Sequence, residues 1–265
     1  MHSTEREALI LDSLKHKGFI SFRELERRVK ASPATIRRDL ARMSTAGLIT
    51  RVRGGAMLGE TASSGSASAQ ASLGLQGVPF HENIHRHRLQ KQAIGRAAAK
   101  LCKSGQGVMI DGGSTTLQMC RHLQGKTMQV LTNSLHIVSA LLAQPGTRVL
   151  MPGGQVFREQ NIVLSADGDD VMPKFHAPQL FMGAASMGPA GLMQADILLI
   201  AAERRLIERA EQIIVLVDSS KFEGHSGHVV CRLEDIDIVV TDSAIASKHV
   251  RMLEKAQVKT IIARD

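Results

Sequence analysis

The stretch SFRELERRVKASPATIRRDLARMSTAGLITRVRGGA, residues 21–56, decides the fold of the amino-terminal part of the chain. Ser32 is a good N-cap, because its hydroxyl can accept a hydrogen bond from a free backbone N–H of the first helical turn. Pro33 suits the next position, where a missing N–H costs nothing. An apolar stripe at helical spacing follows, made of Ile36, Leu40 and Met43. The sequence therefore predicts a short helix over residues 32–45.

The segments around this helix predict a winged helix-turn-helix. Residues 4–17 and 21–29 each carry apolar side chains at helical spacing. Only two residues separate the second of these helices from the 32–45 helix, so the two must cross sharply. Residues 48–53 then alternate apolar and polar, which is the period of a strand, and Gly54-Gly55 turns the chain back. Three helices followed by a β-hairpin make up this fold.

The 32–45 helix also has a cationic face, which is typical of a helix that binds DNA. We expect it to enter a major groove with Thr35 and Arg38 near base edges, while the other arginines contact phosphates. The predicted DNA-binding residues are Ser32, Ala34, Thr35, Arg37, Arg38, Arg42, Arg51 and Arg53. The alternative is a small solvated helical domain with ordinary surface arginines.

The distribution of charge favours a nucleic-acid partner for this domain. Residues 1–58 hold 12 Lys/Arg against 6 Asp/Glu, so a surplus of 6 out of a net charge of +8 lies in the first fifth of the chain. Such a local surplus suits a polyanion. Trp and Tyr are absent and Phe occurs only 7 times, which makes stacking on single-stranded nucleic acid a poor explanation. The expected partner is double-stranded DNA.

The remaining composition predicts a cytoplasmic protein. The cysteines Cys102, Cys120 and Cys231 are scattered and unpaired in spacing, as expected of reduced thiols. The first 18 residues are charged and amphipathic, unlike a signal peptide, and no apolar run approaches the length needed to span a membrane.

A resemblance to a known family rests on residues 32–40 (SPATIRRDL), Gly47-Leu48 and residues 51–56 (RVRGGA). This pattern resembles the N-terminal domain of DeoR-family transcriptional regulators. Members of that family are usually repressors that release DNA when a sugar phosphate binds their C-terminal domain. The resemblance therefore implies operator DNA as one partner and a phosphorylated sugar as the other.

Residues 59–80 are expected to be a flexible linker between a DNA-binding domain, residues 1–58, and a larger domain, residues 81–265. The linker is rich in Gly, Ser, Ala and Gln and cannot bury a core. His81, His85 and His87 follow it closely, but no Cys or acidic partner recurs at ligand spacing. We therefore expect a solvated helix start there, with no metal and no cofactor.

From residue 89 onward, apolar strands alternate with helices. Such alternation predicts an α/β fold, a mostly parallel sheet covered by helices on both faces. Small polar residues cluster where the strands end, which is the edge at which open α/β sheets bind ligands. The best such turn is Asp111-Gly-Gly-Ser-Thr-Thr116, whose residues open a predicted helix at 116–122 and suit a phosphate monoester. Without the Lys of a P-loop, nucleotide hydrolysis is not indicated.

The order and spacing of these turns resemble the DeoR C-terminal sensor domain, which is similar in fold to ribose-5-phosphate isomerase. By resemblance, the turn at 113–116 holds the phosphate, and Asp111, Asn133 and Lys221 approach the sugar. The predicted effector-binding residues are Asp111, Gly112, Gly113, Ser114, Thr115, Thr116, Asn133, Gly153, Gly154, Gly183, Glu203 and Lys221. Many members carry a lysine at the position of Glu203. The segment 191–196 (GLMQAD) followed by Glu203 instead resembles the branch that senses acidic-sugar or polyol phosphates.

The resulting prediction is a repressor of a carbohydrate catabolic operon, relieved by a phosphorylated sugar, sugar acid or polyol. We expect at least a dimer, a homodimer or a homotetramer, because palindromic operators require symmetry. One alternative is an isomerase-like enzyme with an accessory DNA-binding domain. It is disfavoured because residues 184–187 after Gly183 hold no carboxylate for acid/base work, and we predict no catalytic residues. Another is an architectural DNA-binding protein with a ligand-free C-terminal domain.

Overall fold

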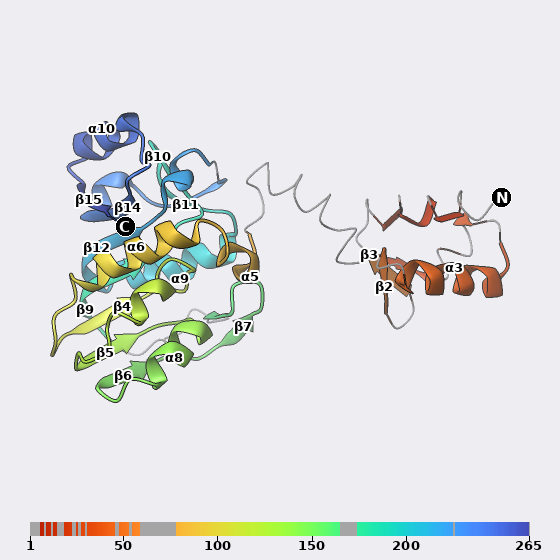
Figure 1. Cartoon of the computed structure of the whole chain (residues 1–265), viewed down its shortest axis with the longest axis horizontal. Helices are drawn as coiled ribbons and strands as arrows, with labels where there is room; N and C mark the ends of the chain where they lie inside the picture. The colour runs from red at the N-terminus through yellow and green to blue at the C-terminus, as the bar shows by residue number, and fades with distance from the viewer. Residues whose placement is uncertain are drawn as a thin grey trace. The chain divides into compact units, whose positions relative to one another are not determined.

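The structure is a computed structural model that forms two compact units, Met1–Leu73 and Gly74–Asp265 (Figure 1). The residues that it describes are 6–7, 9–11, 13–14, 19–22, 25, 28–29, 31–45, 48–52, 55–58, 78–164, 174–224 and 226–264. Most of the predicted linker and Arg53 lie outside the described residues. Phe80, at the end of that predicted linker, is already part of the second unit, since it is buried and its N–H donates to Glu159 O at 2.8 Å.

The first unit contains the predicted helix and hairpin. Helix α3 spans Pro33–Thr45, and strands β2 (Ile49–Val52) and β3 (Gly55–Leu58) form an antiparallel pair. A third strand, β1 (Phe19–Ser21), pairs with β3 and was not predicted, because three residues carry too little alternation to be recognised. The apolar stripe of α3 is buried in a core with residues from the first helix and all three strands.

The second unit is built on a seven-stranded parallel sheet with the order β15-β14-β12-β9-β4-β5-β6 (Figure 1). This confirms the predicted α/β fold. The strands are β4 (Gly107–Ile110), β5 (Met128–Leu131), β6 (Thr147–Leu150), β9 (Ala177–Met182), β12 (Ala210–Leu216), β14 (Ile238–Asp242) and β15 (Lys259–Ala263). All pairings between neighbours are parallel, so all carboxyl ends meet at one edge.

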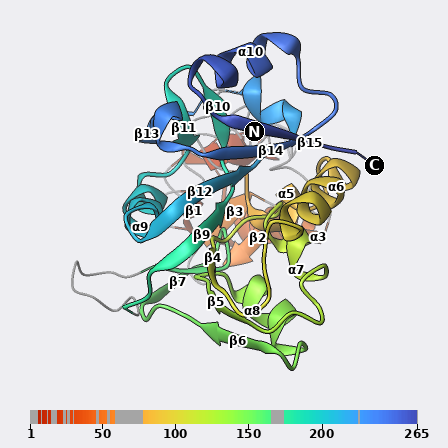
Figure 2. The ribbon, with the colours of Figure 1, turned by 90° about the vertical axis from the view of Figure 1, so that its left-hand side faces the viewer.

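Helices cover both faces of this sheet, as its apolar strands require. Ile214 and Leu216 of β12 pack against the helices on one face, while Ile213 and Val215 pack on the other. Figure 2 shows α6, α7 and α8 on one side and α9 on the other. The helices are α5 (Phe80–Asn83), α6 (Arg88–Ala99), α7 (Leu117–Cys120), α8 (Leu135–Leu142), α9 (Ile197–Ile207) and α10 (Ser247–Lys255).

Two small antiparallel sheets are additions to the predicted parallel sheet. Strands β7 (Gln155–Phe157) and β8 (Ile162–Leu164) form a hairpin, and β10 (Ser186–Gly188), β11 (Gly191–Gln194) and β13 (His228–Cys231) form a three-stranded sheet. Short 3-10 helices, η1 (Ser219–Phe222) and η2 (Leu233–Asp235), follow β12 and β13. Gly191 makes the turn into β11 possible, because its φ is 117° and a Cβ there would lie 2.0 Å from Cys231 O.

Candidate functional site

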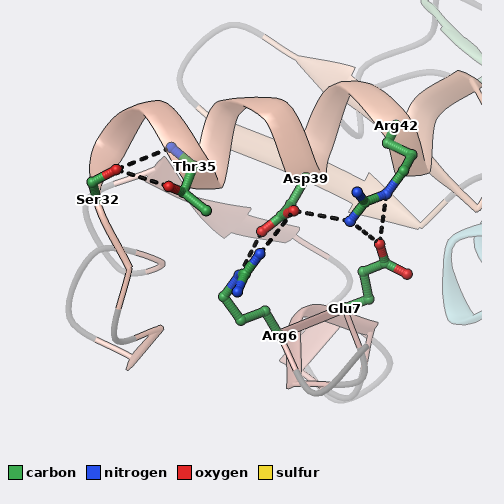
Figure 3. Close-up of polar contacts among 6 residues, drawn as sticks. All are labelled: Arg6, Glu7, Ser32, Thr35, Asp39 and Arg42. Carbon is green, nitrogen blue, oxygen red and sulfur yellow. Dashed lines mark hydrogen bonds and ion pairs between the residues drawn. The ribbon is translucent and has the colours of Figure 1, made fainter. Parts of the chain in front are cut away.

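The start of α3 is capped as the sequence predicts (Figure 3). Ser32 Oγ accepts a hydrogen bond from the N–H of Thr35 at 3.2 Å, and the two hydroxyls lie 2.8 Å apart. The Thr35 hydroxyl, predicted to lie near a base edge, therefore has an intramolecular partner at the helix start. A base would have to compete with Ser32 for it.

The exposed face of α3 contains several of the predicted DNA-binding residues. Ser32, Ala34 and Arg38 are exposed, and Thr35 is partly exposed. Ala34 and Arg38 are four residues apart and so lie on one helix face. Arg37 lies on α3 and Arg51 on β2, but only their backbones are described. The DNA contacts of all these residues remain predictions.

Arg42 belongs to a network of charges that sequence reasoning missed (Figure 3). Asp39 is only 2% exposed, and its carboxylate accepts from Arg6 Nε at 2.7 Å and from Arg42 Nη2 at 2.9 Å. Arg42 also donates to Glu7 through Nε at 2.8 Å. The network joins the first helix to α3, so Arg42 has a structural role beside the predicted phosphate contact.

Arg38 is the side chain of α3 on which we expect base preference to depend. Replacing Arg38 with alanine should relax the preference at one base pair by about 1–3 kcal/mol, because a bidentate arginine–guanine contact is lost. Arg53 is a predicted phosphate contact, so Arg53→Ala should weaken binding to all DNA sequences alike and make the affinity less dependent on salt. Operator binding measured against single-base variants at several salt concentrations distinguishes the two. Equal, sequence-independent losses would contradict the groove assignment.

At the carboxyl edge of the large sheet, the ends of β4 and β5 are tied together. Asn133 Nδ2 donates to Asp111 Oδ1 at 3.0 Å, and Asn133 Oδ1 accepts from the N–H of Gly112 at 2.9 Å. A Cβ at Gly112 would lie 2.4 Å from Ile162 Cγ2, so only glycine fits. The structure thus brings three predicted effector residues into contact, with β8 packed above them.

The turn that follows β4 is buried, and one of its hydroxyl groups already bonds to the backbone of the protein. Ser114 is 4% exposed and Thr115 is 6% exposed, while the Thr116 hydroxyl lies 2.8 Å from Asp111 O and 3.0 Å from Gly113 O. Helix α7 has only four residues, shorter than the predicted 116–122. Because a single turn has a small dipole, it adds little to anion binding at this position.

Two buried carboxyl groups lie near one another beside this turn. Burial raises the pKa of Asp111 to about 6, although hydrogen bonds from Asn133 and Gly112 oppose the shift. Burial also raises the pKa of Glu203 well above its usual range, and the charge of Asp111 adds to that effect. Glu203 Oε1 accepts from Gln194 Nε2 at 2.5 Å, whereas Glu203 Oε2 has no partner among the described residues. Such a buried atom without a partner favours a hydrogen-bonding group from a ligand.

We predict that Asp111→Asn stabilises the larger domain at neutral pH. The native pKa of Asp111 is raised, so the folded state binds the proton more tightly than the unfolded state. Stability should therefore fall as pH rises from about 4 to about 6 and stay lower above it. Asparagine does not titrate, so the variant avoids this loss of stability, which is about 3 kcal/mol at pH 8. The free energy of unfolding of the variant should therefore vary less with pH. Thermal unfolding of the full chain at pH 5 and pH 8 measures it.

The control for that variant is Asp196→Asn. Asp196 caps α9 by accepting from the N–H of Leu198 at 2.9 Å and is partly exposed. Asparagine caps a helix about as well as aspartate, so this variant should leave the stability profile nearly unchanged. An Asp111→Asn protein with the wild-type profile would show that this carboxyl does not carry the predicted penalty.

The remaining predicted effector residues lie at the ends of other strands. Gly153 and Gly154 follow β6, and Gly183 follows β9 in open space, where an added Cβ would meet nothing within 4 Å. Lys221 lies in η1 after β12, and burial lowers the pKa of its ammonium group. The parallel sheet brings all these strand ends to one edge.

Sequence reasoning missed Lys91, which is 1% exposed on α6. Burial lowers its pKa to about 8, while the charge of Asp218 opposes the shift. The sequence did carry a signal for it, because Lys91, Ile94 and Ala98 share one helix face. A lysine in an apolar stripe is a candidate buried cation.

Other features of the described residues add little to this site. An open cavity of about 530 Å³ lies at the opposite, amino-terminal edge of the sheet, where Gly105, Thr127 and Arg148 line it. In the part of the chain that the structure describes, no three His, Cys, Asp or Glu side chains gather as metal ligands would. No helix among the described residues is both long enough and apolar enough to cross a membrane.

A winged helix-turn-helix followed by an α/β domain with a polar edge defines the class of two-domain transcriptional regulators. The chain belongs to the DeoR family. The family model described as the DeoR C terminal sensor domain matches residues 86–243, and the DeoR-like helix-turn-helix domain matches residues 6–62. The predicted resemblance is thereby confirmed, and so is the interpretation as a regulator rather than an enzyme.

The chain is also similar to individual proteins. The chain is 28% identical over 254 residues to the HTH-type transcriptional regulator UlaR of Escherichia coli (strain SMS-3-5 / SECEC), covering 96% of each chain. Ribose 5-phosphate isomerase A from Methanocaldococcus jannaschii is 18% identical over 50% of this chain and 53% of its own, with a TM-score of 0.37. The translation initiation factor eIF-2B of Pyrococcus horikoshii OT3 is 15% identical over 83% of this chain and 72% of its own, with a TM-score of 0.36.

Proposed function

We propose that this regulator represses a carbohydrate catabolic operon in the cytoplasm and that a phosphorylated sugar, sugar acid or polyol relieves the repression. The observation that carries the proposal is the polar edge of the larger domain. There, buried carboxyl oxygens such as Glu203 Oε2 and Asp218 Oδ2 have no partner among the described residues. Unsatisfied buried polar atoms cost free energy, and the hydroxyls of a sugar, which both donate and accept, would satisfy them.

The proposed repressor works as a homodimer or homotetramer with three segments. Residues 1–58 bind the operator, residues 59–80 link the two domains, and residues 81–265 bind the effector. A two-fold operator favours a symmetric assembly. The effector can change operator affinity only by binding one arrangement of the protein more tightly than the other.

Gel-shift titrations with a panel of phosphorylated sugars, sugar acids and polyols test the proposal. Each phosphorylated compound is compared with its unphosphorylated parent at equal ionic strength, because salt alone weakens DNA binding. We expect one phosphorylated compound to release the protein from the operator, while its unphosphorylated parent does not. If no compound of the panel alters operator affinity, the effector half of the proposal fails.

A further inference from the structure

One side of the β7–β8 hairpin is bonded to the polar turns at the carboxyl edge of the large sheet. The N–H of Val163, in β8, donates to Asn133 O at 2.8 Å. The side chain of Asn133 in turn accepts from the N–H of Gly112 at 2.9 Å. Ile162 packs so closely on Gly112 that a Cβ there would lie 2.4 Å from Ile162 Cγ2. Strand β8 is therefore in direct contact with the turn that follows β4.

The tip of the same hairpin is bonded to the end of the predicted linker. Gln160 Nε2 donates to Val78 O at 3.1 Å, and the N–H of Phe80 donates to Glu159 O at 2.8 Å. The Phe80 ring is 3% exposed and stacks on the ring of His136 in α8, with the centroids 4.3 Å apart. Because α5 has only four residues, these contacts with distant segments fix the position of this part of the chain.

The hairpin between these two sets of contacts is short and regular. Strands β7 and β8 pair antiparallel over three residues each, and residues 158–161 form the turn. Asn161 has a φ of 52°, in the left-handed region that asparagine tolerates better than most residues. Coupling within a protein is carried by hydrogen-bond networks and rigid elements of this kind. A displacement of β8 beside Gly112 should therefore also move Glu159 and Gln160.

We propose that the β7–β8 hairpin transmits a change at the turn after β4 to residues 78–80, and that Gln160 is the positioning residue that attaches the hairpin to them. Residues 78–80 end the predicted linker, so they belong to the covalent connection between the two domains. A ligand that shifts Gly112 or Asn133 would in this way shift the point at which the linker leaves the larger domain. The inference rests on the proposed function and names the element that joins its two sites.

Gln160→Ala tests the proposal in the full chain without any ligand, by amide hydrogen exchange followed by NMR. The lost bond is a neutral hydrogen bond at the tip, so the amide of Phe80 should exchange about fivefold faster. If the hairpin transmits the change, the amide of Gly112 at its other side should also exchange faster, by at least about twofold. The N–H of Val217, which bonds within the large sheet, should keep its wild-type exchange rate.

The matched control is Gln155→Ala, the same substitution at an exposed residue of β7 in the same hairpin. All three amides should exchange in this variant as they do in the wild type. An unchanged Gly112 amide beside a faster Phe80 amide in Gln160→Ala would overturn the proposal, because the tip and the turn would then move independently. Unchanged exchange at Phe80 would overturn it as well, since Gln160 would not hold the segment. Equal acceleration in both variants would do the same.

Operator release distinguishes this inference from the function on which it rests. The probe is the compound of the panel that releases the wild type from the operator in the gel shifts. Gln160→Ala should bind this compound with an affinity close to the wild-type value. The factor by which the compound weakens operator binding should nevertheless fall by about threefold, because the path between the two sites is loosened.

Two results separate the two claims. Equal release from Gln160→Ala, Gln155→Ala and the wild type would overturn the inference and leave the repressor proposal intact. If no compound releases the wild type, the repressor proposal fails. The exchange rates of Gly112 and Phe80 then decide by themselves whether the hairpin links the turn to the linker.

Discussion

Asp39→Ala is expected to lower the melting temperature of the amino-terminal domain by roughly 5–10 °C and to abolish operator binding. The Asp39 carboxylate is buried and accepts hydrogen bonds from both Arg6 and Arg42. Removing one partner of a buried ion pair destabilises strongly, because the other charge stays behind. Loss of this link also weakens the attachment of α3 to the first helix, so the predicted DNA-binding face is held less firmly. Calorimetric unfolding of the full chain, with operator binding measured alongside, tests the prediction.

Arg42→Gln provides the matched control, because it removes an outer member of the same network. The Arg42 side chain is 56% exposed, and in this variant Asp39 keeps its pair with Arg6, so the loss should stay under about 1 kcal/mol. The variant should therefore melt close to the wild type, and any loss of operator affinity reports on the predicted phosphate contact. Equal melting temperatures for Asp39→Ala and the wild type would contradict the structural role of the network.

Gly112→Ala is expected to destabilise the larger domain by about 1–3 kcal/mol and to abolish the response to the effector. Its Cβ would meet Ile162 Cγ2 at 2.4 Å and Asn133 Oδ1 at 3.2 Å. Ile162 is buried, so β8 or the turn must shift, and either shift separates Asn133 from Asp111. Thermal unfolding and operator release by the effector are the two measurements.

Gly183→Ala serves as the comparison at the end of a neighbouring strand. Nothing lies within 4 Å of the added methyl group, and a substitution into open space changes stability by only about 0.5 kcal/mol. A Gly112→Ala protein as stable as Gly183→Ala would mean that the close approach of β8 to the turn does not constrain the fold.

The regular elements could be predicted because their signals are local. The strand ends carrying Asp111, Asn133 and Lys221 were recognised from apolar runs followed by small polar residues. Parallel pairing then brings those ends to one edge without any knowledge of side-chain contacts. Helix α3 was predictable for the same reason, since its cap and its apolar stripe lie within 14 residues of sequence.

What could not be predicted depends on contacts between distant segments. Arg42 pairs with Glu7, which is 35 residues away, and no local pattern in the sequence indicates that pair. Lys91 was overlooked because a lysine in a helix is ordinarily solvated, and its burial follows from how α6 crosses the sheet. Strand β1 has three residues, too few for a period to appear.

The most direct test of the two-site account is calorimetric titration of the releasing effector into free protein and into protein saturated with operator DNA. Coupling between two binding sites is reciprocal, so an effector that weakens operator binding must itself bind the operator complex more weakly, by the same factor. We predict an affinity at least about tenfold lower in the presence of operator, a coupling of about 1.4 kcal/mol. Equal affinities in the two titrations would contradict the account.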